Sequence, residues 1–212
     1  MNIDESVLES FKAGIEKDWE KALIFICPAI EATARKTHGK SKVTKEEFKE
    51  FLRDRNRIIE AFVGVGLNLD ETRFPNTRIE TDGGRLITEP DFADIVYHAF
   101  RCAGAHGHAI AKEFSFIEAI SAEPATWLIG AGDGRIHMPD KVVWALIACV
   151  VFAEANNDIE TTTALFLTWG GGATGRGDPY RFDIDLWWGC EEILKRFLLR
   201  KNLTRVALKF SG

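Results

Sequence analysis

The stretch that decides the fold is Lys21-Ala-Leu-Ile-Phe-Ile-Cys-Pro-Ala-Ile-Glu31-Ala-Thr-Ala34. Its apolar side chains are spaced three and four residues apart. The same spacing begins upstream, so the full set is Leu8, Phe11, Ile15, Trp19, Ala22, Leu23, Ile26 and Ile30. This pattern predicts one long amphipathic helix. We expect a Ser6-x-x-Glu9 capping box at its start, a kink at Pro28 and an end at His38–Gly39.

Capping motifs and prolines predict where further helices begin. Thr44-x-x-Glu47 is a second capping box, and Pro90 and Pro139 suit first helical turns. Asp183 is expected to cap the last long helix. The apolar face of that helix would hold Leu186, Trp187, Cys190, Ile193, Leu194 and Phe197. Together these signals predict a mainly α-helical bundle.

Two regions interrupt the helical pattern. Residues 68–88 are polar and predict an irregular insertion with a short hairpin around Arg78–Ile87. Phe114–Ser121 and Thr126–Ile129 are expected as short strands, and Arg135–Met138 is expected to pair back after the turn at Gly130–Gly134. We therefore expect a bundle with a small β-hairpin between helices, organised as a single domain over residues 1–212 with an insertion near 68–88 and a C-terminal helical extension over 158–212.

Charge is unevenly distributed along the chain. The net charge of −5 argues against a protein that holds nucleic acid by bulk electrostatics. Nine basic residues nevertheless lie between Arg35 and Arg57, interrupted by four acidic ones. Residues 195–209 add six basic side chains and no acidic one. These two segments either meet phosphate groups or form solvated helix faces.

Cysteine usage and hydropathy bear on the compartment. The chain has four cysteines without a C-x-x-C pair, each among apolar neighbours, which fits free thiols in a reducing compartment. Residues 1–9 are acidic and lack an apolar segment, so we expect no signal peptide. No apolar run reaches the roughly 20 residues that span a bilayer. We therefore expect a cytoplasmic protein without a membrane partner.

The candidate chemistry lies in Tyr97-His-Ala-Phe-Arg-Cys-Ala-Gly-Ala-His-Gly-His108. Arg101 and His106 stand at the end of an amphipathic helix. On an ideal helix the two side chains would be separated by about 140° around the helix axis. Gly104 lets the helix end distort, however, so both side chains can border one groove. An arginine at this position also suits a purely structural role, because it can bind the last helical carbonyls. His106 and His108 leave a metal site open as an alternative.

These residues resemble the HEPN family, whose members carry an arginine, four to six residues and a histidine at the end of a helix in a helical bundle. Arg101 and His106 match that spacing, and the aromatic residues before Arg101 are similar. The predicted first helix also resembles the family's opening helix, with the acidic Glu31 after an apolar run. The resemblance covers residues 18–154. Cys102 departs from it, since many members have a polar residue after the arginine.

The resemblance implies metal-independent RNA cleavage without a cofactor. His106 is expected to take the proton of a ribose 2′-hydroxyl and Arg101 to stabilise the phosphate, which leaves a 2′,3′-cyclic phosphate end. Glu31, Tyr97 and His108 are implied as supporting residues, and the family implies a homodimer. Two alternatives stay open: a non-catalytic module that binds RNA, a nucleotide or a cognate partner protein, and a metal-dependent hydrolase using His106 and His108.

Overall fold

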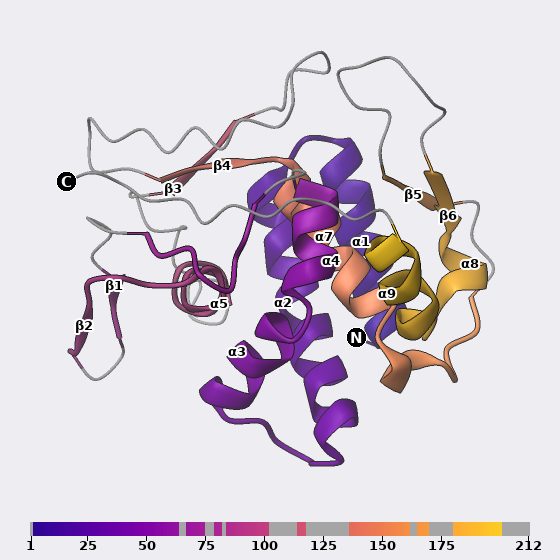
Figure 1. Cartoon of the computed structure of the whole chain (residues 1–212), viewed down its shortest axis with the longest axis horizontal. Helices are drawn as coiled ribbons and strands as arrows, with labels where there is room; N and C mark the ends of the chain where they lie inside the picture. The colour runs from indigo at the N-terminus through magenta and orange to yellow at the C-terminus, as the bar shows by residue number, and fades with distance from the viewer. Residues whose placement is uncertain are drawn as a thin grey trace.

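The computed structural model describes residues 2–63, 67–74, 79–81, 84–101, 114–117, 136–161, 165–169 and 180–200. These residues are mainly helical, as the sequence predicts (Figure 1). The helices are α1 (Ile3–Ile15), α2 (Trp19–His38), α3 (Lys45–Arg53), α4 (Asn56–Val63), α5 (Phe92–Ile95), the π-helical η1 (Val96–Arg101), α7 (Lys141–Val151), the short η2 (Glu154–Asn156), α8 (Ile184–Trp187) and α9 (Glu191–Arg200). The strands are β1 (Ile79–Glu80), β2 (Leu86–Ile87), β3 (Phe114–Ile117), β4 (Ile136–Pro139), β5 (Phe166–Trp169) and β6 (Tyr180–Asp183).

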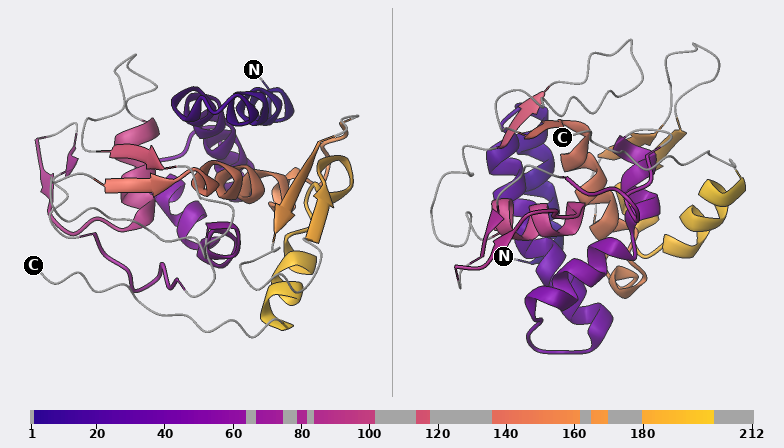
Figure 2. Two further views of the ribbon diagram at one scale, coloured as in Figure 1. Left: turned by 90° about the horizontal axis from the view of Figure 1, so that it is seen from above. Right: turned by 60° about the vertical axis from the view of Figure 1, so that its left-hand side comes forward.

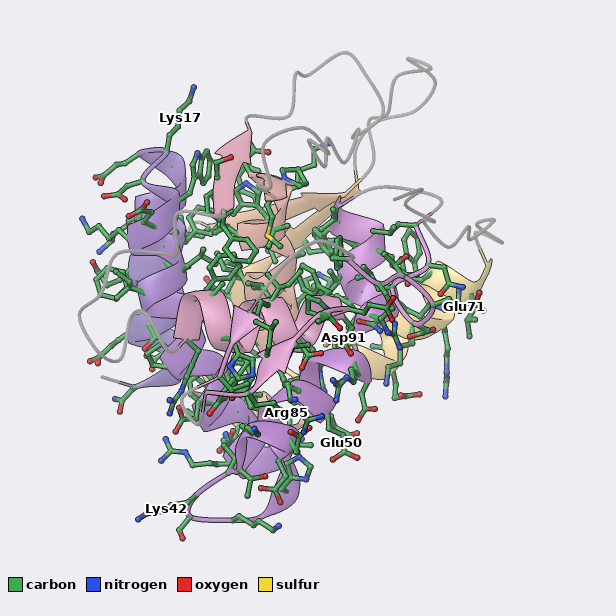
Figure 3. The ribbon with its side chains drawn as sticks, turned by 90° about the vertical axis from the view of Figure 1, so that its left-hand side faces the viewer. Lys17, Lys42, Glu50, Glu71, Arg85 and Asp91 are labelled. Carbon is green, nitrogen blue, oxygen red and sulfur yellow. The ribbon has the colours of Figure 1, made fainter. Side chains whose placement is uncertain are left out.

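The N-terminal apolar pattern folds as two helices rather than one. Asn2 opens α1 with a capping box of its own, so the predicted box at Ser6 is wrong and Ser6 is buried inside the helix. The chain turns at Lys17, whose φ of 62° is left-handed, and Asp18 then caps α2. Lys17 projects outward from this turn (Figure 3). The apolar spacing did not reveal the break because both helices bury residues with the same period.

Helix α2 ends where the sequence predicts. Gly39 has a left-handed φ of 61°, and its amide donates to the carbonyls of Arg35 and Lys36. The helix is continuous across Pro28. Proline deprives the carbonyl four residues earlier of its partner, and both Pro28 and Ile24 are exposed, so water can reach that carbonyl.

Helix α7 is the centre of the packing. It has 11 residues, of which all but Lys141 and Trp144 are buried, and it packs against α1, α2 and α4. A helix that is apolar on all sides must be enclosed by other elements. Pro139 was expected in its first turn but instead ends β4, and Asp140 is the N-cap. Burial raises the pKa of the Cys149 thiol on this helix to about 12, so that thiol is inert.

The strands form three small pairs. The hairpin predicted around Arg78–Ile87 is confirmed, since β1 and β2 pair antiparallel with Ile79 opposite Ile87. Two of the strands expected within residues 114–138 are present as β3 and β4, which pair in parallel with Phe114 opposite Ile136 (Figure 2). Residues 126–129, the expected hairpin partner of Arg135–Met138, lie outside the described residues, so that hairpin stays a prediction. The residue pattern of a short strand does not name its partner, so the pairing of β3 with β4 was not predictable from it.

The segment expected as a helical extension also contains strands. β5 and β6 pair antiparallel before α8 begins, and they lie with α8 at the opposite side of the molecule from β1 and β2 (Figure 1). Asp183 precedes only the four-residue α8, and Gly189 with φ of 75° separates it from α9. Two members of the predicted apolar face, Leu186 and Ile193, are 75% and 58% exposed, whereas Leu194 joins the main core.

Within the described ranges, no helix is both long and apolar enough to cross a bilayer.

Candidate functional site around Arg101

Arg101 is the last residue of η1, which continues α5. The Asp91 carboxylate accepts a hydrogen bond from the Asp94 amide at 2.8 Å, and the Asp94 carboxylate accepts one from the Asp91 amide at 3.2 Å. Asp91 is thus the N-cap, and Pro90 lies just before it rather than in the first turn. From Val96 to Arg101 the helix has π geometry. Such segments are rare and occur frequently at functional sites.

Ion pairs fasten the start of this helix to α3. Lys49 Nζ lies 3.0 Å from Asp94 Oδ1, and Arg53 Nε donates to Asp91 Oδ2 at 2.7 Å. Asp91 is labelled in Figure 3, beside the helices that this cluster joins. Burial alone raises the pKa of Asp94, but the hydrogen bond and charge of Lys49 outweigh it and hold the pKa below its ordinary value of 3.8. The cluster therefore fixes the start of the helical segment that carries Arg101.

The guanidinium of Arg101 meets α2. Its Nε and Nη2 atoms lie 3.3 and 3.1 Å from a single oxygen, Oε2 of Glu31. Its Cζ atom stands 5.5 Å from the centroid of the Tyr97 ring, within the range of a cation–π contact. The side chains of Arg101 and Glu31 are 29% and 33% exposed, so solvent reaches both. Three of the predicted site residues thus come together from α2 and η1.

The other two predicted site residues, His106 and His108, lie outside the described residues, as does Cys102. Their placement beside Arg101 stays a prediction. Among the residues that the structure does describe, no three histidine, cysteine or carboxylate side chains gather as metal ligands.

Most of the basic run between Arg35 and Arg57 is matched by acids. Its members pair as Lys36 with Asp158, Lys40 with Glu47, Lys49 with Glu46 and Asp94, Arg53 with Asp91, and Arg55 with Glu191. The hydrogen bond from Lys40 lowers the pKa of Glu47 to about 2. Lys42 instead projects from the turn between α2 and α3 (Figure 3). This run therefore offers a phosphate chain much less positive charge than its sequence suggests.

A buried ion pair that sequence reasoning missed joins the α3–α4 turn to α9. Arg55 Nη2 donates to Glu191 Oε2 at 2.6 Å, and its guanidinium lies 3.8 Å from the Phe51 ring centroid. Lys195 Nζ is 2.8 Å from the other Glu191 oxygen. The pair lines a groove of about 660 Å³. Arg55 and Glu191 are 136 positions apart, so no local pattern could have linked them.

Comparison with known proteins places the chain among bacterial relatives. It is 28% identical to the uncharacterized protein Mb1320 of Mycobacterium bovis and to the uncharacterized protein Rv1289 of Mycobacterium tuberculosis, over 99% of this chain and 94% of each relative. No solved structure matches it. The Rv1289 family model matches residues 2–212, and the chain therefore belongs to the Rv1289 family.

Proposed function

We propose that this protein is a HEPN-like, metal-independent endoribonuclease whose reacting groups are Arg101 and His106. The observation that supports the proposal is the convergence of Arg101, Tyr97 and Glu31, three residues that the resemblance singles out, at a partly exposed position. An arginine used only to cap its own helix would bind that helix's carbonyls, whereas this guanidinium reaches across to α2.

The chemistry requires one base and one stabiliser of negative charge. Neutral His106 takes the proton of a ribose 2′-hydroxyl, and the 2′-oxygen attacks the adjacent phosphorus. The bond from phosphorus to the 5′-oxygen breaks, and the leaving oxygen takes up a proton. Arg101 donates to the phosphoryl oxygens as charge builds on them. The products are a 2′,3′-cyclic phosphate end and a 5′-hydroxyl end.

The proposal also covers the compartment and the oligomeric state of the protein. It is a cytoplasmic homodimer in which two Arg101–His106 sets face one groove. Sedimentation equilibrium tests the dimer directly, and a monomer at micromolar concentration would remove that part of the proposal.

RNA cleavage in the presence of EDTA tests the function. The wild-type protein should cut single-stranded RNA, and Arg101→Ala and His106→Ala should each reduce the rate by at least about a hundredfold. Arg85→Ala is the matched control, because Arg85 is an exposed arginine outside the site (Figure 3). Circular dichroism spectra of all variants should coincide. Equal cleavage by both site variants and the wild type would show that the site is wrongly assigned.

A second candidate is a module that binds a nucleotide without cleaving RNA. The observation that favours it is the pairing of the basic run with acids, which leaves less positive surface for a long phosphate chain. This candidate predicts nucleotide binding that weakens with salt, depends on Arg101 and yields no product.

A further inference from the structure

We infer that Glu31 is a carboxylate latch on Arg101, which holds the guanidinium in the free protein and yields it to a substrate phosphate. The inference rests on the proposed function in that it concerns the same arginine. It adds a regulatory element to that site, namely competition between an internal anion and the ligand.

The geometry of the pair favours exchange. Two of the three guanidinium nitrogens of Arg101, Nε and Nη2, donate to one oxygen, Oε2 of Glu31, at 3.3 and 3.1 Å. A guanidinium binds best when two parallel N–H groups meet two separate oxygens. A phosphate diester offers two such oxygens at the spacing of the guanidinium fork. The incoming phosphate therefore makes a better-matched contact than the carboxylate that it replaces.

The solvent exposure of the Arg101–Glu31 pair lowers the cost of separating the two side chains. The side chains of Arg101 and Glu31 are 29% and 33% exposed, whereas those of the Arg55–Glu191 pair are each 6% exposed. A buried carboxylate that loses its partner is stranded without water, but a partly exposed one is hydrated as it leaves. Of these two ion pairs, Arg55–Glu191 is therefore the one that stays closed and Arg101–Glu31 the one that can open.

Tyr97 keeps the arginine in place during the exchange. The Tyr97 ring lies 5.5 Å from the Arg101 guanidinium carbon, and this contact does not involve Glu31. Tyr97 itself packs edge-on against Phe48 of α3, with ring centroids 5.3 Å apart. Arg101 therefore remains oriented when the carboxylate leaves, so opening the latch presents a positioned cation rather than a mobile one.

Neutralising Glu31 tests the latch. Glu31→Gln removes the competing charge with little change of shape, so binding of inorganic phosphate and of a 2′-O-methyl RNA that cannot be cleaved should tighten roughly twofold to fivefold. Titration calorimetry measures the first and fluorescence anisotropy the second. Glu9→Gln is the control, because it removes one negative charge from another partly exposed ion pair, with Lys12. Adding Arg101→Ala to Glu31→Gln should abolish the gain.

The outcomes separate the latch from the ribonuclease. Phosphate binding that is unchanged or weaker in Glu31→Gln overturns the latch, even if the wild type cleaves RNA. A gain equal to that of Glu9→Gln also overturns it, since the effect would then be one of net charge. A specific gain without any RNA cleavage by the wild type supports the latch and removes the ribonuclease.

Discussion

Gly14 faces the indole of Trp144 where α1 crosses α7. A β-carbon at this position would lie 2.7 Å from Cη2 of that ring. The ring is rigid and has Phe11 at its edge, with centroids 5.2 Å apart, so it has little room to shift. Gly14→Ala should therefore destabilise the protein by about 1 to 3 kcal/mol, measured by urea unfolding. In a Trp144→Leu background the same change should be neutral; an equal cost there would exclude the ring as its cause.

Replacing Arg101 by lysine tests what the planar guanidinium group contributes beyond its positive charge. Arg101→Lys keeps the charge but cannot bind two phosphate oxygens side by side, so RNA cleavage should fall about a hundredfold. Because the side chain is 29% exposed, the free energy of unfolding should change by no more than about 1 kcal/mol. Cleavage kinetics and urea unfolding measured together check both expectations. Cleavage at the wild-type rate would show that the charge alone is sufficient.

The first residue of helix α9 joins it to the body of the protein through an ion pair, in addition to its apolar packing. Glu191 accepts from Arg55 and from the Glu154 amide, and Glu191→Ala leaves Arg55 buried without its carboxylate. We expect a loss of about 3 to 5 kcal/mol in the free energy of unfolding. The double variant Arg55→Met, Glu191→Leu should recover most of this loss, because no buried charge is left unpaired. A double variant as unstable as Glu191→Ala would contradict this explanation.

The attachment of α5 to α3 should weaken in acid. The pKa of Asp94 is held below 3.8 in the folded protein, so its contribution to stability is present above that pH and is lost as the pH falls through the folded value. Asp94→Asn should cost about 1 to 2 kcal/mol at pH 7 and progressively less below pH 4. Urea unfolding of both proteins at pH 7 and pH 3 measures this difference. A difference that stays constant with pH would exclude Asp94 as the titrating group.

The described core is continuous from the first helix to the last. One cluster of buried apolar residues extends from Val7 in α1 to Leu198 in α9. Phe62 of α4, Phe152 after α7 and Phe182 of β6 meet within it, with ring centroids 5.3 to 6.4 Å apart. Urea unfolding followed by tryptophan fluorescence and by circular dichroism should therefore give one coincident transition. Two separated transitions would show that the C-terminal helices unfold as an independent unit.

The sequence by itself determined the features that depend on neighbouring residues. The period of α2, the glycine that ends it and the capping box of α3 were predictable because a helix is stabilised by contacts three and four residues apart. For the same reason the sequence placed Arg101 on a helical segment. The break at Lys17 was missed, because a single left-handed residue leaves the apolar spacing on either side unchanged.

Only the tertiary structure decided which distant residues meet. The parallel pairing of β3 with β4, the neutralisation of the basic run by acids on other elements, and the 70-residue separation bridged by Arg101 and Glu31 all depend on how helices pack. Charge attraction acts through space and has no period along the chain, so a list of residues shows that ions are present but not how they pair.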